Sequence, residues 1–219
     1  MRLNLSLNHP LLALGTRLSA AGVSFAFGVV AARLLGLEQF GQFSVMLAFF
    51  NVGVVVALLG HESLAVRNIA AATSSKETKP VLPAYRSAAI EHVWVIGILV
   101  ACLEFVVLKC LPVGDSISGE WFLLMALIPL VARTRLSQAM LRGAHLSSLA
   151  IVPDGLLRPL ISLSIVVLAA SIIRANSILL LVVAMFLSSI VALWIASLWE
   201  RWKLGALKLN RLKSVGNIS

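Results

Sequence analysis

The sequence predicts an all-α membrane protein with six transmembrane helices, and three observations support this fold class. First, 60% of its 219 residues are hydrophobic and only 12% are charged, whereas soluble domains average about 45–50% apolar and about 25% charged residues. Second, several stretches exceed the roughly 18 nearly uncharged residues that indicate a bilayer span. Third, the roughly ten-residue alternating segments of a membrane barrel are absent. Helices satisfy the backbone hydrogen bonds that lipid cannot.

Six apolar runs define the predicted helices, and together residues 1–200 make one transmembrane domain. A polar connection at 61–83 separates the second run from the third, and a turn-rich break at 112–119 separates the third from the fourth. The fifth run contains Pro153 and Pro159, which favour a bend. The predicted spans are about 11–35, 41–60, 87–111, 120–142, 149–173 and 177–199, and a basic cytoplasmic tail follows at 201–219.

The basic residues predict the orientation of these helices. The net charge is +9, and the basic residues sit in short connections between apolar runs, which argues against a nucleic-acid partner. If the N-terminus is cytoplasmic, the opposite side holds only Arg33, Lys109 and Arg174. Cytoplasmic loops carry an excess of Lys and Arg, so we expect both termini inside a bacterial inner membrane. The cytoplasmic set is then Arg2, Arg67, Lys76, Lys79, Arg86, Arg133, Arg135, Arg142, Arg201, Lys203, Lys208, Arg211 and Lys213.

The first span carries a stripe of small residues and an intramembrane arginine. Ala20, Ser24, Gly28 and Ala32 recur every four residues and therefore share one helix face. Such a stripe lets another helix approach closely, or part of it lines a solute pathway. Arg17 lies within two turns of the stripe. It either binds a phosphate or diphosphate through its planar fork of donors, or its side chain reaches the membrane interface.

Two further groups of charged residues are candidate site residues. Asp154 and Arg158 stand four residues apart at the start of the fifth span, so they share a helix face. They form either a local ion pair or a charged gate. Arg135, Gln138 and Arg142 share a face of the fourth span. They bind lipid head groups or line a cavity mouth, or they form a solvated face that fixes topology.

Catalytic and metal-binding motifs are missing, so the sequence predicts neither an enzyme nor a metal or cofactor site. It has no P-loop, no His-Glu-x-x-His pair and no Gly-x-Ser-x-Gly elbow. Glu91 and His92, near the cytoplasmic end of the third span, could relay protons. Cys102 and Cys110 lie about 12 Å apart along one helix, too far for a disulfide within that helix.

Three segments resemble polysaccharide-transporter flippases, the O-antigen and lipid-linked oligosaccharide exporters with a MATE-like fold. Residues 31–44, AARLLGLEQFGQFS, are similar to the end of their first helix and the start of their second. Residues 59–67, LGHESLAVR, are similar to the exit of the second helix. The triplet 141–143 and residues 153–159, PDGLLRP, are similar to the connection between the fourth and fifth helices. The resemblance runs from about residue 15 to residue 199.

The resemblance implies a flippase that is driven by protons, other ions or the membrane potential. It would move polyprenyl-diphosphate-linked glycans across the membrane by alternating access, with cavity arginines on the diphosphate. Arg17 is best placed for that role, followed by Arg158 and Arg135. The family has two six-helix lobes, and this chain resembles the N-terminal one. We therefore expect a truncated product, an early stop, or a half-transporter that pairs with a second lobe or a second copy, surrounded by membrane lipids.

Two other functions stay open on the sequence alone. A drug/cation antiporter of the same superfamily would need a buried acid in a cation cavity, whereas the excess of charged residues within these spans is of arginine. A membrane scaffold of a polysaccharide-export cluster, without transport activity, would need no binding arginine.

Overall fold

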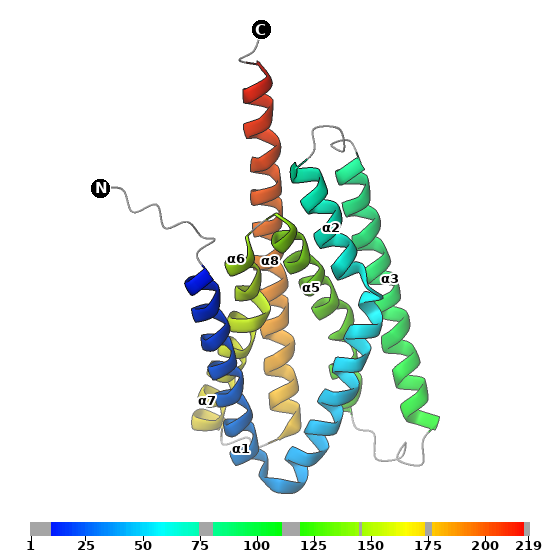
Figure 1. The fold of residues 1–219 in the computed structure, drawn as a ribbon. Coiled ribbons are helices and arrows are strands. Elements are labelled where there is room, and N and C mark those ends of the chain that lie inside the picture. Colours follow the sequence, from blue (N-terminus) through cyan, green and yellow to red (C-terminus); the bar gives the residue numbers. More distant parts are fainter. Residues whose placement is uncertain (1–9, 75–80, 111–118, 145, 174–176, 217–219) are drawn as a thin grey trace, which may run out of the picture.

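The computed structural model describes residues 10–74, 81–110, 119–144, 146–173 and 177–216, and within these ranges the chain is helical with no β-strand. Five of its apolar helical stretches are long enough to cross a membrane. The first of them is sharply bent, so the five stretches form six helical rods, at residues 10–35, 37–58, 81–110, 119–143, 147–173 and 178–216. The rods pack as a bundle (Figure 1). In chain order the helices are α1 Pro10–Leu58, α2 His61–Ser74, α3 Val81–Cys110, α4 Gly119–Met125, α5 Ile128–Gly143, α6 Ser147–Ile151, the π-helix η2 Val152–Leu157, α7 Arg158–Ile173 and α8 Ile178–Gly216.

Gly36 produces the bend in α1. Its φ of 74° and ψ of 177° lie in a region that only glycine occupies readily, because a Cβ there meets the backbone. The first arm of α1 (10–35) and the second arm (37–58) correspond to the first two predicted spans, and helix resumes directly after Gly36. Figure 1 shows the two arms diverging as a V from this bend, with the start of α1 and the end of α8 toward its open end.

The polar connection predicted at 61–83 is helical over residues 61–74, where it forms α2. Leu59 and Gly60, with φ values of 40° and 79°, end α1. Glu62 then lies in the first turn of α2, where a negative charge interacts favourably with the helix dipole. Ala65 and Ile69, four residues apart, are buried, and α2 packs against α5. The predicted break at 112–119 lies outside the described residues except for Gly119.

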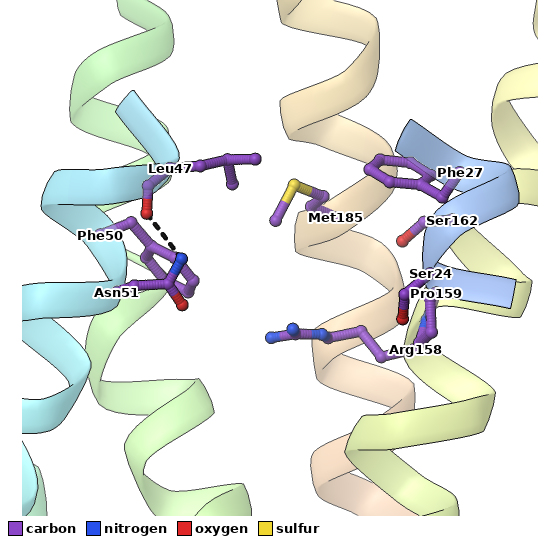
Figure 2. A pocket seen from close by; sticks show the side chains of 9 residues that line it. All are labelled: Ser24, Phe27, Leu47, Phe50, Asn51, Arg158, Pro159, Ser162 and Met185. Carbon is purple, nitrogen blue, oxygen red and sulfur yellow. Dashed lines mark hydrogen bonds between the residues drawn. The ribbon is translucent and has the colours of Figure 1, made fainter. Parts of the chain in front are cut away.

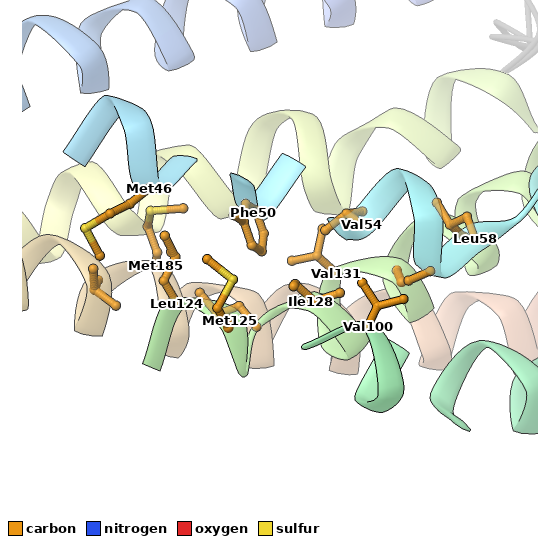
Figure 3. Packing of buried hydrophobic residues seen from close by; sticks show 14 of the residues in the cluster. Met46, Phe50, Val54, Leu58, Val100, Leu124, Met125, Ile128, Val131 and Met185 are labelled. Carbon is orange, nitrogen blue, oxygen red and sulfur yellow. The ribbon is translucent and has the colours of Figure 1, made fainter. Parts of the chain in front are cut away.

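Helix α5 lies at the centre of the bundle. It packs against α1, α2, α3 and α8, and 67% of the apolar stretch to which it belongs is buried, compared with 22% for the stretch in α3. The second arm of α1 presents a residue to this core at every fourth position, as Figure 3 shows. Because α5 is surrounded, its polar residues Arg133, Thr134 and Ser137 are buried, whereas Arg142 near its end is exposed. The labelled core residues are Met46, Phe50, Val54, Leu58, Val100, Leu124, Met125, Ile128, Val131 and Met185.

The fifth rod is irregular at its start. Residues Val152–Leu157 form the π-helix η2 between α6 and α7, with Pro153 inside it and Pro159 just after it. Proline removes a backbone donor and disturbs the regular hydrogen-bond ladder, and single π-turns of this kind are frequent at functional sites. The π-turn carries Asp154 at its start. At the other end of the chain, α8 continues as helix through the predicted tail to Gly216.

Candidate functional site

Two arginines from different rods meet one carboxylate at the π-turn. Arg158 at the start of α7 places its Nη1 atom 3.1 Å from Oδ1 of Asp154. Arg135 on α5 places its Nε atom 3.6 Å from Oδ2 of the same carboxylate. The three side chains are 15–26% exposed. The cluster holds two guanidinium groups and one carboxylate, so it keeps one positive charge.

The guanidinium of Arg158 has unused hydrogen-bonding capacity. Its Nη1 atom is buried and makes no hydrogen bond within the described residues, and the same holds for Oδ1 of Asp154. The two atoms therefore attract each other as charges without the alignment of a hydrogen bond. Gln138, one turn along α5 from Arg135, also has a buried amide nitrogen without such a partner. Buried donors of this kind are costly unless a ligand or water satisfies them.

Arg158 lines a cavity of about 180 Å³ between the two arms of α1 (Figure 2). At ~30 Å³ per water, this volume suits a small charged group rather than a whole oligosaccharide. In Figure 2 the Arg158 side chain extends from α7 across the cavity toward Asn51 on the second arm. Polar and apolar groups share its wall, which is formed by Ser24, Phe27, Leu47, Phe50, Asn51, Arg158, Pro159, Ser162 and Met185.

Hydrogen bonds inside the wall hold two of its polar side chains. Asn51 donates from Nδ2 to the carbonyl oxygen of Leu47, one turn earlier, at 2.8 Å. Its carbonyl end stays on the cavity side, as Figure 2 shows. The Ser162 hydroxyl lies 2.7 Å from that of Ser188 on α8, and Ser188 donates to the carbonyl oxygen of Met185. These bonds join α7 to α8 behind the cavity.

Of the predicted stripe of small residues on the first arm, only Ala20 and Ser24 lie at this site. Ala20 is buried, and a Cβ built on Gly155 of the π-turn would lie 3.4 Å from the Ala20 Cβ, so the stripe approaches η2 there. Ser24 is exposed and lines the cavity. Ala32 is half-buried, and a Cβ built on Gly28 would meet open space, so no other helix in the described part of the chain approaches closely there.

Arg17 and the Glu91–His92 pair lie apart from the cavity. The Arg17 side chain is exposed and belongs neither to the cavity wall nor to the ion pairs of Asp154. Glu91 and His92 are exposed on α3. The His92 ring lies 6.0 Å from that of His61 at the start of α2. Within the described ranges, no three His, Cys, Asp or Glu residues come close enough to hold a metal ion.

A second buried ionic network escaped the sequence analysis. Glu200 on α8 is fully buried and accepts hydrogen bonds from Arg86 of α3, from Arg133 of α5 at 2.9 Å and from Ser137 at 2.7 Å. Arg133 also donates to Ser137. From the sequence alone, the sixth span was predicted to end at residue 199, and both arginines were predicted to fix the topology. The available signal was a glutamate directly after an apolar run, with Arg86 directly before the third predicted span and Arg133 inside the fourth.

The Glu200 network and the Asp154 cluster differ in how many of their hydrogen-bonding groups are satisfied. The Glu200 network is saturated with hydrogen bonds and ties three rods together. The Asp154 cluster keeps donors unused beside a cavity. Unused cationic donors in a low-dielectric site bind anions, since guanidinium groups match carboxylate and phosphate oxygens.

Comparison with known proteins gives one result. No curated protein and no solved structure matches the chain. A family model described as "Polysaccharide biosynthesis protein" matches residues 11–218, which is nearly the whole sequence. This match confirms the family expected from the sequence, while the MATE-like fold stays a prediction. With its apolar helices, the chain is a multi-pass membrane protein, and it belongs to the polysaccharide biosynthesis protein family.

Proposed function

We propose that the chain moves polyprenyl-diphosphate-linked saccharides across the inner membrane, with Arg158 and Arg135 binding the diphosphate. The observation that carries this proposal is the buried Nη1 atom of Arg158, which has no hydrogen-bond partner among the described residues and belongs to a side chain that lines the cavity. Family membership supports transport over catalysis, because members of this family are transporters.

Asp154 sets the resting state of the two arginines in this proposal. Without ligand, its carboxylate holds both guanidinium groups close together and offsets their repulsion. A diphosphate presents more oxygen acceptors than a carboxylate and carries more charge, so it competes for the forks of donors. The diphosphate can also be released, because Asp154 forms its ion pairs with both arginines again as the anion leaves.

The cavity wall supports a substrate with chemically different parts. Ser24, Asn51 and Ser162 offer neutral polar groups beside the cation, which suit phosphate oxygens or the first sugar. Phe27, Leu47 and Phe50 give an apolar wall that suits the start of a lipid chain. The saccharide itself exceeds the cavity of about 180 Å³ and would extend out of it.

The bend at Gly36 gives the proposal a mechanical basis. Opposite walls of the cavity belong to the two arms of α1, with Ser24 on the first arm and Asn51 on the second. A change in the angle between the arms therefore opens or closes the cavity, as alternating access requires. A second six-helix unit, either another lobe or a second copy of the chain, would cover the open side.

Transport by the reconstituted chain tests this function. Movement of a fluorescent polyprenyl-diphosphate saccharide across proteoliposome membranes is measured for the wild type, Arg158→Gln and Arg142→Gln. Arg142 is the matched control, because it forms an exposed ion pair with Glu62 at 3.8 Å. We expect Arg158→Gln to lose movement and Arg142→Gln to keep it. Equal rates in all three, or no movement by the wild type as a single chain and as a linked tandem pair, would overturn the proposal.

A further inference from the structure

Glu104 places a carboxyl group inside the apolar part of the bundle. It lies on α3, six residues before the helix ends at Cys110, within a predicted membrane span. Its side chain is part-buried, and its Oε2 atom is fully buried without a hydrogen-bond partner in the part of the chain that the structure describes. A charged carboxylate in such a place is expensive, because no donor among the described residues offsets the lost hydration of its buried Oε2 atom.

Gly53 on the second arm of α1 makes room for this carboxyl group. A Cβ built on Gly53 would lie 2.5 Å from Oε1 of Glu104 and 2.7 Å from Cδ1 of Ile128 on α5. The carboxyl group is therefore packed directly against the backbone of α1, with α5 at its side. This contact exists only because residue 53 has no side chain.

On each helix packed around Glu104, the next charged residue lies several positions away along the helix. The second arm has no charged residue between Glu38 and the end of α1. On α5 the first charge after Ile128 is Arg133, which is held by Glu200. On α4 the acidic residue is Glu120 in the first turn, and on α3 itself Lys109 is in the last turn.

Glu120 also has a buried Oε2 atom without a hydrogen-bond partner among the described residues, but its place is different. It lies in the first turn of α4, where free backbone N–H groups and the helix dipole favour a negative charge. Glu104 lies in the interior of a long helix, where the backbone N–H groups are already used. Of the two carboxyl groups, only that of Glu104 therefore lies in the interior of a long apolar helix.

We propose that Glu104 is a proton-binding site that controls the second arm of α1. With its proton, the neutral carboxyl packs against Gly53, as described here. Without it, the carboxylate needs hydration, and the second arm separates from α3 to admit water. The proton leaves to water, and no other bond changes. The same arm carries Phe50 and Asn51, within one turn of Gly53, so its movement changes the cavity that holds Arg158. Coupling of this proton to transport rests on the proposed function.

Infrared spectroscopy tests the proton site without any substrate. Difference spectra between acid and alkaline buffer are recorded for the purified chain in lipid, as wild type, Glu104→Gln and Glu120→Gln. We expect a carboxylic-acid C=O band at neutral pH that disappears in Glu104→Gln and persists in Glu120→Gln. Glu104→Asp keeps a carboxyl group and should keep a band, which controls for damage to the fold. A spectrum that Glu104→Gln leaves unchanged would overturn the proposal.

Cysteine labelling tests the control of the arm. Asn51→Cys is introduced with Cys102 and Cys110 replaced by serine, and its reaction with a water-soluble maleimide is timed at neutral and alkaline pH. The introduced thiol also reacts faster at alkaline pH because it loses its own proton, and this effect is the same with Glu104 and with Glu104→Gln. The difference between the two proteins in the alkaline increase of the labelling rate therefore reports the movement of the second arm. We expect the alkaline increase to be several-fold larger with Glu104 than with Gln. Equal increases would overturn arm control, whereas a failure of diphosphate binding would leave both measurements unaffected.

Discussion

Removing the charge of Glu200 should destabilise the bundle more than removing any exposed charge. The Glu200 carboxylate is fully buried and binds three donors on two other rods. Glu200→Gln keeps the shape of the side chain but leaves Arg133, whose side chain is 7% exposed, without its counter-charge. Arg86 is 32% exposed, so it can turn toward the interface and recover hydration.

The expected cost follows from these burial values. Breaking a buried ion pair by removing one partner costs about 3–5 kcal/mol. The amide oxygen of Gln keeps neutral hydrogen bonds, and Arg86 can relax, so we expect the lower end, about 3 kcal/mol. The control, Glu62→Gln, removes an exposed pair whose closest approach to Arg142 is 3.8 Å, and it should cost about 0–1 kcal/mol.

Reversible unfolding by SDS in mixed micelles, followed by circular dichroism, measures both free energies. A double-mutant cycle with Arg133→Met adds a second check, because the double variant no longer buries an uncompensated charge on either side. It should therefore be less destabilised than the sum of the single variants. If Glu200→Gln and Glu62→Gln cost the same, or the cycle shows no coupling, the network does not hold the three rods together.

Three further predictions use the same unfolding assay. Gly53→Ala should cost about 1–3 kcal/mol through overpacking, while Gly28→Ala, with open space at its Cβ, should be neutral or stabilising; equal effects would contradict the packing described. Gly36→Ala should cost about 1–3 kcal/mol, because its φ of 74° strains any side chain, and an unchanged stability would mean that α1 straightens. Ser162→Ala should cost about 1 kcal/mol by breaking the buried hydroxyl pair with α8; no loss would show that water replaces the bond.

Features that depend on local sequence could be predicted. The length of the apolar runs is tied to bilayer thickness. The first two of the six predicted spans appear as the arms of α1, and the other four coincide with the four remaining apolar helical stretches within a few residues. The Asp154–Arg158 approach follows from helix spacing alone, because residues four apart share a face. The helix α2 was not predicted, because most residues of this segment are polar or small and its two buried residues, Ala65 and Ile69, give only a weak helical pattern.

Features that depend on how helices rotate against each other could not be predicted. The approach of Arg135 to Asp154 joins α5 to the π-turn, and nothing within either helix fixes that contact. The same is true of Glu200, whose burial needs α8 to stay helical past residue 199, where the predicted span ends, and to face α5. Arg17 is exposed and lies outside the cavity wall, so its role in substrate binding stays a prediction.

Binding of a diphosphate lipid to the purified chain tests the proposed site most directly. The dissociation constant of a short polyprenyl diphosphate is measured in nanodiscs for the wild type, Arg158→Gln and Arg142→Gln. A lost charge-assisted hydrogen bond is worth about 1.5–3 kcal/mol, so Arg158→Gln should weaken binding by about 10- to 150-fold, while Arg142→Gln should bind as the wild type does. If Arg158→Gln binds the lipid as tightly as the wild type, the cavity beside Arg158 is not the diphosphate site.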